Sequence, residues 1–402
     1  MKILLASYFD LPHVGGLWTY VRQLEARLRE LGHDVDIFAR GSDPASYRML
    51  TDGRSVEASK MIDPISRNLT AYYEKERPDI PEWVRRREIE RYAYEAAAIY
   101  FGLGDYDVIH AQDIVSSRAL WRVKPKRTPL VATLHSCLAT AYLETGEVNG
   151  RDSKEWIYAA KEEYYGALSN DVALVPSHWL RRMLHHEFGV PNSHVHVIPY
   201  GLDLSSYAEA AVRPSDFVRP PGKAVIVCPA RLVPAKGHAA LLQSLARLRQ
   251  ERDDWECWIV GDGPLRGALQ AETERLGLQA EIRFLGDRDD APALIRLADV
   301  VVMPSLLDHQ PYSIMEAQIA GKPVVASDAG GIPEMIRHGD TGFLFPKGDS
   351  DALCRQLSNA LYDKALAKVV GQRAMLWGQS HWSLDRRVGE TLLLYRQLVN
   401  GS

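Results

Sequence analysis

Short runs of apolar residues alternate along the chain with longer segments in which apolar residues recur every three or four positions. In the first half, the short runs predict strands at 3–7, 35–39, 107–111, 130–134, 172–175 and 195–198. Between the first two, the spacing of Val21, Leu24 and Leu28 predicts a helix over 17–31. Strands that are apolar throughout and separated by helices form parallel sheets covered on both faces, so we expect a Rossmann-like unit.

The second half repeats this alternation after a break at 206–222, which is rich in proline and ends in Gly222. Strands are predicted at 224–228, 255–260, 282–285, 300–303 and 323–326. Helices are predicted near 239–250, 265–276, 291–297 and 313–320, and a final helix spans 384–400. The same pattern predicts a second Rossmann-like unit.

These patterns divide the chain into an N-terminal domain at 1–205, a linker at 206–222, a C-terminal domain at 223–382 and a helical segment at 383–402. We expect that last segment to pack back toward the N-terminal domain. The predicted fold class is α/β, with two Rossmann-like domains facing across a cleft. Open α/β sheets bind ligands at the carboxyl ends of their strands, so such a cleft suits two substrates.

One stretch, 60–104, departs from the alternation. It is rich in tyrosine and arginine and is predicted to be mostly helical after Pro81. The favoured interpretation is a solvated helical insertion, because charge runs usually keep a face in water. The alternative is a surface that receives a substrate or binds anionic lipid through Arg85–Arg91, which makes peripheral contact with a membrane a second hypothesis.

Composition restricts the classes of function. The 402 residues are 46% hydrophobic and 25% charged, which is ordinary for a globular protein of two domains. Lys plus Arg number 48 against 52 acidic residues, so the net charge of −4 disfavours sequence-independent binding of nucleic acid. The four cysteines are dispersed, and no apolar run approaches the roughly 18 residues that span a bilayer. We therefore expect a cytoplasmic protein without a disulfide framework or zinc site, at most peripheral at the inner membrane face.

Two cations follow the strand at 224–228. Arg231 and Lys236 lie in a loop at its carboxyl end, and Gly237 allows close approach of the backbone. Such a loop suits a diphosphate. The next strand is followed by Gly261 and Gly263, an incomplete dinucleotide fingerprint that still favours a turn in contact with a nucleotide.

The stretch 304–326 is the most informative. A strand ends, a loop contains Asp308, and a helix begins near Ser313 with Glu316 in its first turn. The amides at a helix start favour a phosphate group. Asp308 is a candidate for binding sugar hydroxyls and Glu316 for binding a ribose, although Glu316 could also simply complement the helix dipole.

Taken in order, these motifs resemble glycosyltransferase family four, the retaining enzymes of the GT-B fold. In the second half the resemblance rests on 230–237, 260–265, 284–286, 304–305, 316–326 and 330–334. In the first half it rests on Gly15-Gly16, 32–35, 133–135 and 198–203. The similarity therefore spans nearly the whole chain.

The resemblance implies roles for particular residues. Arg231 and Lys236 would bind the donor diphosphate, with Gly15 and Gly16 close to it and the amides near Ile314 and Met315 completing the cradle. Glu316 would hold the ribose, and His135 would lie near the transferred sugar. We assign catalytic roles to His135, Arg231, Lys236 and Asp308. The residues assigned to donor binding are Gly15, Gly16, Arg231, Lys236, Gly261, Gly263, Asp308, His309, Gln310, Ser313, Ile314, Met315 and Glu316.

The chain departs from the family at three positions. Asp308 replaces the first of two glutamates, Gln310 replaces an aromatic residue, and Gln112 replaces a frequent histidine. These changes bear on the identity of the donor sugar more than on the class of reaction. Contacts to Asp308, His309 and Gln310 are expected to identify that sugar.

The expected activity is retaining transfer of a hexose from a nucleoside-diphosphate sugar, with a UDP-sugar favoured, to a hydroxyl acceptor that is a sugar, a lipid-linked group or a small molecule. The resemblance implies that the cations and helix-start amides stabilise the diphosphate without a metal, and we see no D-x-D motif of the kind that would hold a diphosphate through a metal. We therefore expect no metal and no cofactor besides the nucleotide sugar. Two alternatives remain open: a non-catalytic nucleotide-sugar-binding protein, and a GT-B epimerase or hydrolase that acts on the donor without an acceptor.

Overall fold

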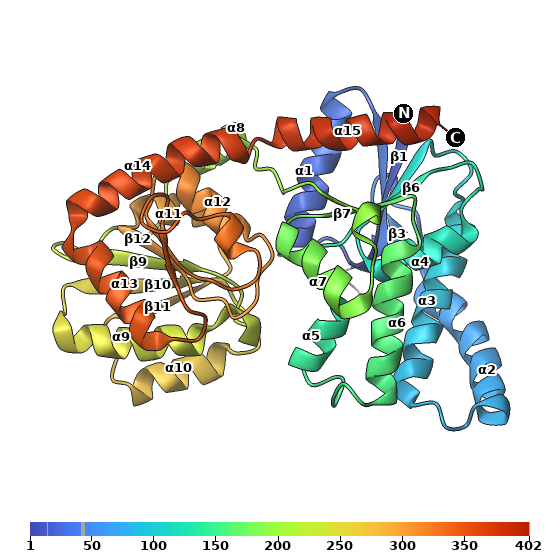
Figure 1. Ribbon diagram of the computed structural model, residues 1–402, viewed down its shortest axis with the longest axis horizontal. Coiled ribbons are helices and arrows are strands. Elements are labelled where there is room, and N and C mark those ends of the chain that lie inside the picture. The colour runs from blue at the N-terminus through green and yellow to red at the C-terminus, as the bar shows by residue number, and fades with distance from the viewer. Residues whose placement is uncertain (14, 42–44, 402) are drawn as a thin grey trace. The chain divides into compact units, whose positions relative to one another are not determined.

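The computed structural model describes residues 1–13, 15–41 and 45–401. Its contacts divide the chain into two units, Met1–Pro199 with Asp385–Ser402, and Tyr200–Leu384. Both are α/β, with helices on both faces of a mainly parallel sheet, as Figure 1 shows. The Rossmann-like architecture predicted for each half is thereby confirmed.

Unit 1 contains an eight-stranded sheet in the order β4-β3-β2-β1-β5-β6-β7-β8. Neighbouring strands in the run β2-β1-β5-β6-β7-β8 are parallel. Strands β3 and β4 extend the sheet beyond β2 as antiparallel neighbours. Its strands are β1 (Lys2–Asp10), β2 (Asp34–Arg40), β3 (Ser46–Met49), β4 (Ser55–Glu57), β5 (Val108–Ala111), β6 (Leu130–Thr133), β7 (Val172–Val175) and β8 (Val195–Val197). Its helices are α1 (Gly16–Glu30), α2 (Ala58–Glu76), α3 (Glu82–Phe101), α4 (Ile114–Val123), α5 (Leu138–Glu144), α6 (Lys154–Leu168), α7 (His178–Phe188) and nearly all of α15 (Leu384–Asn400).

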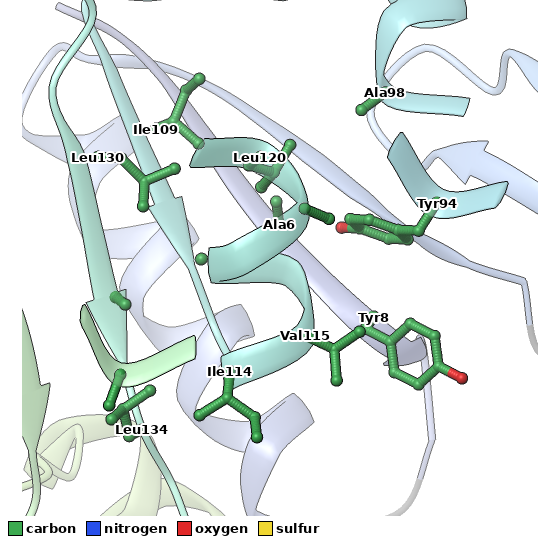
Figure 2. Close-up of a cluster of buried hydrophobic side chains, with 14 of the residues drawn as sticks. Ala6, Tyr8, Tyr94, Ala98, Ile109, Ile114, Val115, Leu120, Leu130 and Leu134 are labelled. Atoms are coloured by element: carbon green, nitrogen blue, oxygen red, sulfur yellow. The ribbon is translucent and has the colours of Figure 1, made fainter. Parts of the chain in front are cut away.

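The core of unit 1 lies between this sheet and its helices. Strands β5, β6 and β7 are buried along their whole length because helices cover both faces. Figure 2 shows side chains of this core: Leu120 of α4 lies toward Ile109 of β5 and Leu130 of β6, whereas Ile114, at the start of α4, lies toward Leu134 just after β6. This packing fixes the carboxyl ends of β5 and β6.

Unit 2 contains a six-stranded parallel sheet in the order β11-β10-β9-β12-β13-β14. Its strands are β9 (Ala224–Pro229), β10 (Trp255–Val260), β11 (Ile282–Gly286), β12 (Val300–Met303), β13 (Val324–Ser327) and β14 (Phe343–Phe345). Its helices are α8 (Leu204–Ala211), α9 (His238–Glu251), α10 (Arg266–Arg275), α11 (Ala291–Leu297), α12 (Tyr312–Ile319), α13 (Ser350–Tyr362) and α14 (Lys364–His381). In Figure 1, α9 and α10 lie on one face of this sheet and α11 and α12 on the other.

The structure corrects several predicted boundaries. The division between the units falls after Pro199 rather than after 205, and the predicted linker 206–222 contains most of helix α8. No range was predicted for strands β3, β4 and β14 or for helices α4, α5, α6, α7, α13 and α14. The three strands are only three or four residues long, too short to show a clear alternation of apolar and polar residues.

The structure confirms a helix after Pro81 in the arginine-rich insertion and corrects the interpretation of two of its arginines. The insertion forms two helices, α2 and α3, and α2 precedes Pro81. Arg87 and Arg91 of α3 are buried rather than solvated. Arg87 binds Glu162 of α6 at 3.2 Å, and Arg91 pairs with Glu88 and Glu95 on its own helix. These two guanidinium groups are therefore not available to bind anionic lipid, whereas Arg86 of the same helix is exposed.

Within the described residues, no helix combines the length and the apolar character needed to cross a membrane.

Candidate functional site

In unit 2 the predicted donor residues gather where strands β9, β10 and β12 end. The loop after β9 contains a single 3-10 turn, Pro234–Lys236, followed by Gly237 with φ of 68°. A Cβ at Gly237 would lie 1.9 Å from the carbonyl oxygen of Pro304, so only glycine lets this loop press against the loop after β12. That approach places Lys236 beside Asp308.

Lys236 and Asp308 form an ion pair between the two loops. The Nζ of Lys236 donates to Oδ2 of Asp308, and both side chains are largely buried, at 23% and 12% exposed. Oδ1 of Asp308 accepts from the backbone amide of His309, and the hydroxyl of Ser305 lies 3.3 Å from Oδ2. The predicted phosphate ligand and the predicted sugar ligand are thus in contact with each other.

Arg231 is the second predicted phosphate ligand. Its side chain is exposed, and no hydrogen bond or ion pair reaches it from the described part of the chain. Gly261 and Gly263 pack behind its loop: a Cβ on Gly261 would lie 2.4 Å from the Ala230 carbonyl oxygen, and one on Gly263 2.6 Å from that of Leu232. These two glycines therefore support the loop of Arg231 by close backbone packing.

The start of α12 differs in detail from the predicted cradle. The hydroxyl of Ser313 donates to the carbonyl of Pro229 at 2.7 Å and ties α12 to the end of β9. The amide of Ile314 donates to the Pro311 carbonyl at 3.2 Å, and the side chains of Ile314 and Met315 are fully buried. The side chains of these three residues anchor the helix, and the Ile314 amide is already engaged.

Glu316 lies one turn into α12 and is half-buried. In the residues that the structure describes, its carboxylate makes no hydrogen bond and no ion pair. Burial raises the pKa of Glu316 from 4.5 to about 7. The buried hydroxyl of Tyr207 on α8 has no hydrogen-bond partner among the described residues, and burial followed by the charge of Glu316 raises the pKa of Tyr207. A carboxylate held in this state is suited to accept hydrogen bonds from a ligand.

His309 and Gln310, both predicted to touch the sugar, are buried. Burial lowers the pKa of His309 to about 4, so its imidazole is neutral. The Oε1 of Gln310 accepts from the backbone amide of Tyr200 at 2.6 Å. The ring of Tyr200 stacks on Tyr312 at 5.4 Å between centroids. Gln310 therefore fixes the loop 304–311 against the first residue of unit 2, a role that local sequence could not reveal.

In unit 1 a pocket of about 340 Å³ opens at the carboxyl ends of β1, β5 and β6. Apolar and polar groups share its wall, which suits a ligand with both a ring face and hydroxyl groups. The lining residues are Phe9, Asp10, His13, Leu17, Gln112, Asp113, Ile114, His135, Ser136 and Leu138. Predicted residue His135 is one of them.

Gln112 orients His135 in this pocket. Its Nε2 donates to the His110 carbonyl at 3.2 Å, so its Oε1 faces Nε2 of His135 at 3.1 Å. An amide oxygen can only accept, so a neutral His135 has its proton on Nε2. The ring of Tyr20 packs edge-on against this imidazole at 4.9 Å. The substitution noted in the sequence thus still supplies His135 with a hydrogen-bond partner.

Gly15 and Gly16 stand at the start of α1 in the same unit. The Gly15 carbonyl accepts from the amide of Thr19 at 3.1 Å, and a Cβ on Gly15 would lie 3.1 Å from Nε2 of His13. The predicted site residues accordingly form two groups. Gly15, Gly16 and His135 lie in unit 1, and all the others lie along one edge of the sheet in unit 2.

Comparison with known proteins agrees with this architecture. Residues 14–206 match the family described as Glycosyltransferase Family 4, and residues 213–377 match the family described as Glycosyl transferases group 1. The two matches occur in the order expected from the sequence motifs.

Two curated relatives match over most of their length. The chain is 30% identical to the phosphatidyl-myo-inositol mannosyltransferase of Mycobacterium leprae, over 89% of this chain and 86% of that protein. It is 28% identical to the MMP alpha-(1->4)-mannosyltransferase of Mycolicibacterium hassiacum, over 99% of this chain and 98% of that protein.

Among solved structures, the sucrose-phosphate synthase of Thermosynechococcus elongatus is similar over the full length of both chains, with a TM-score of 0.72 and 21% identity. That likeness shows a shared fold, and the relatives show a shared family. The chain belongs to glycosyltransferase family 4, whose members have the GT-B fold and transfer a sugar from a donor to an acceptor.

Proposed function

We propose that this glycosyltransferase moves a hexose from a nucleoside-diphosphate donor to a hydroxyl group, and that unit 2 binds the donor. The observation that carries the proposal is the pairing of Lys236 with Asp308 at the edge of the sheet where open α/β folds bind ligands, with Arg231 in the same loop as Lys236 and no ion pair to it from the described residues. A guanidinium and an ammonium at this edge suit the charge of a diphosphate.

The ion pair suggests how donor binding prepares the site. A diphosphate has more negative charge than one carboxylate and competes with Asp308 for the ammonium of Lys236. Asp308, once released, is free to accept hydrogen bonds from sugar hydroxyls. Before the donor binds, Lys236 and Asp308 pair with each other. After it binds, Lys236 contacts the diphosphate and Asp308 contacts the sugar, as the sequence predicted for each.

Glu316 is proposed to hold the ribose. Its carboxylate is half-buried and without a hydrogen-bond partner in the described chain, so a ribose diol would supply the two donors that it lacks. The cost of burying this carboxylate is offset only when a ligand donates to it.

We propose that the sugar is transferred with retention of configuration and without a metal. The bond between C1 of the sugar and the diphosphate oxygen breaks, and the bond between C1 and the acceptor oxygen forms on the same face. The departing phosphate oxygen takes the proton of the acceptor hydroxyl. Arg231 and Lys236 stabilise the negative charge that grows on the diphosphate, which is where electrostatic stabilisation is most effective.

The donor and acceptor follow from chemistry and from the relatives. A UDP-hexose was favoured from the sequence, whereas the two relatives are named as mannosyltransferases, so GDP-mannose stands beside it as a donor to be tested. The pocket of unit 1, with imidazole, amide and apolar groups, suits a hydroxyl on a sugar or cyclitol as acceptor.

A panel of UDP- and GDP-hexoses with sugar, cyclitol and lipid-linked acceptors tests the proposal. Acceptor-dependent release of nucleoside diphosphate is expected for the wild type. Arg231→Ala and Lys236→Ala should each lower kcat/KM by about 100-fold or more, the usual loss when a group that stabilises transition-state charge is removed. Arg355→Ala, which removes an exposed arginine of α13, is the matched control and should change little.

Two outcomes contradict the proposal. Undiminished release in both variants would show that these cations do not bind the diphosphate. Conversion of the donor at the same rate with and without acceptor would indicate hydrolysis or epimerisation instead of transfer.

A further inference from the structure

A second cavity system lies at the opposite edge of the unit 2 sheet. It surrounds the residues that precede or begin the strands: Ala224 opens β9, Asp299 precedes β12 and Pro323 precedes β13. In a parallel sheet these amino ends are a full strand length from the carboxyl ends that position Arg231 and Lys236. For the six residues of β9 that length is about 20 Å.

Two adjoining pockets, of about 350 and 240 Å³, share Ala224, Asp299 and Lys364. The turn 220–222, part of the predicted linker, forms one wall. Five cationic side chains line the two pockets, against two carboxylates: Arg219, Lys223, Lys322, Lys364 and Lys368 face Asp254 and Asp299. In a chain of net charge −4, this is a local excess of positive charge.

Both carboxylates already have partners. Asp299 Oδ2 accepts from Arg219 at 2.6 Å and from the Val225 amide at 2.8 Å. Asp254 forms an ion pair with Arg252 at 2.7 Å. Within the described residues, no hydrogen bond or salt bridge reaches the ammonium groups of the four lysines.

Among the cations that line the two pockets, Lys322 is the one whose charge is disfavoured by burial. It follows the end of α12 and is half-buried, and its neighbours include the guanidinium groups of Arg219 and Arg296. Burial lowers the pKa of Lys322; Asp299 opposes this effect, and Arg219 and Arg296 add to it. Because Asp299 is engaged by Arg219, an anion bound beside Lys322 would stabilise its half-buried ammonium.

We propose that these two pockets, defined here as the basic pocket, bind the phosphate group of an anionic ligand separately from the sugar donor. A phosphate has the multiple charge and the acceptor oxygens that several lysines can share. The volumes admit a small phosphate ester or the headgroup of an anionic lipid. The basic pocket is thus a second anion site in this enzyme, on the far edge of the sheet from the diphosphate cations.

The test measures binding of inorganic pyrophosphate by calorimetry in an Arg231→Ala background, in which the donor site is weakened. A single binding event should remain, and it should weaken with added salt because it is electrostatic. Changing Lys322 and Lys364 together to Gln should weaken it by about tenfold or more, because both changes remove a charged donor from the phosphate. The matched control changes the exposed Lys126 and Lys161 to Gln, which alters net charge equally.

A vesicle arm separates the two sources of phosphate. Flotation with phosphatidylglycerol vesicles, compared with phosphatidylcholine vesicles, reports headgroup binding by the same variants. Lysine-dependent binding of pyrophosphate alone assigns the pocket to a free phosphate ligand, and lysine-dependent flotation assigns it to a headgroup. If neither probe binds, or if both bind the Lys322/Lys364 variant and the control equally well, the proposal is wrong. Donor turnover by the Lys322/Lys364 variant, measured with Arg231 intact, confirms that these two changes leave the protein folded.

Discussion

At the scale of single residues, the side chains with most consequence are polar groups whose partners come from distant parts of the chain. Lys236 meets Asp308 across 72 residues, and Gln310 reaches the amide of Tyr200 across 110. The sequence identified these residues as chemically important from their neighbours alone. It could not identify the contacts, because contacts between loops depend on how the strands are ordered in the sheet.

Glu316, the residue proposed to hold the ribose, carries a cost in stability. Its pKa is raised from 4.5 to about 7, so between these values the folded state keeps a proton that the unfolded state has released. Stability therefore falls as the pH rises from about 4.5 to 7, and the full cost is present above 7. We expect Glu316→Gln to be about 1–3 kcal/mol more stable than wild type at pH 8, with the difference shrinking toward pH 5.

Urea unfolding at several pH values checks this expectation, with the exposed Glu274→Gln as the control. The same Glu316→Gln variant should bind the donor more weakly, because an amide accepts fewer hydrogen bonds from a diol than a carboxylate. If Glu316→Gln were less stable than wild type at pH 8, another group in the folded protein would have to stabilise the charged carboxylate of Glu316.

Gln112 offers a test of the tautomer assigned to His135. Gln112→Glu places a carboxylate against Nε2 of His135 and should raise the pKa of that imidazole by about 1–2 units. Gln112→Leu should leave the imidazole without this partner and lower its pKa. Titration of the imidazole resonances by NMR measures both. Equal titration curves in all three proteins would mean that Gln112 does not set the protonation of His135.

At the scale of elements, the alternation of apolar runs located most of the strands of both sheets. It did so because strands buried on both faces must be apolar throughout. The short strands β3, β4 and β14 escaped it, as did α13 and α14. The buried face of α14 consists of small residues such as Gly371 and Ala374, which pack closely but give little hydrophobic signal.

Gly237 shows what a single position contributes to the meeting of two loops. Gly237→Ala would drive a methyl group into the Pro304 carbonyl, so the loops of Lys236 and Asp308 must separate. We expect a loss of about 2–4 kcal/mol in stability together with most of the donor-dependent turnover. Gly277→Ala is a matched control, because Gly277 has nearly the same φ, 69° against 68°, with no atom within 4 Å of the new Cβ.

Urea unfolding and turnover assays on both glycine variants separate backbone strain from steric displacement. Gly277→Ala should cost only about 1 kcal/mol and leave activity intact. If the two variants were equally stable and equally active, the close approach of Gly237 to the Pro304 carbonyl would not be needed for stability or turnover.

At the scale of the whole molecule, the chain returns to its first unit at the end. Residues Asp385–Ser402 belong with Met1–Pro199, although the whole of unit 2 separates them in sequence. On α15, Tyr395 is fully buried and its hydroxyl binds Nδ1 of the buried His110. Unit 1 is therefore complete only when the last helix has been made.

Adjacent leucines on α15 test this dependence. Leu392 is 5% exposed and Leu393 is 59% exposed. Leu392→Ala should destabilise unit 1 by about 2–5 kcal/mol, as is usual for a buried leucine, whereas Leu393→Ala should change it little. Hydrogen exchange resolved by peptide would show faster exchange in unit 1 and unchanged exchange in unit 2. An equal effect of the two substitutions would contradict the packing of α15 on unit 1.

The sequence by itself determined two Rossmann-like units, the class of enzyme, and the loops that hold its charged residues. These properties follow from local periodicity and from short motifs, which depend only on residues close together in the chain. Only the tertiary structure decided that Lys236 pairs with Asp308, that Arg87 and Arg91 are buried, and that five cations line the basic pocket. Those outcomes depend on the order of strands in each sheet, because that order brings residues from separate loops within a few ångströms and fixes how much water each charge keeps.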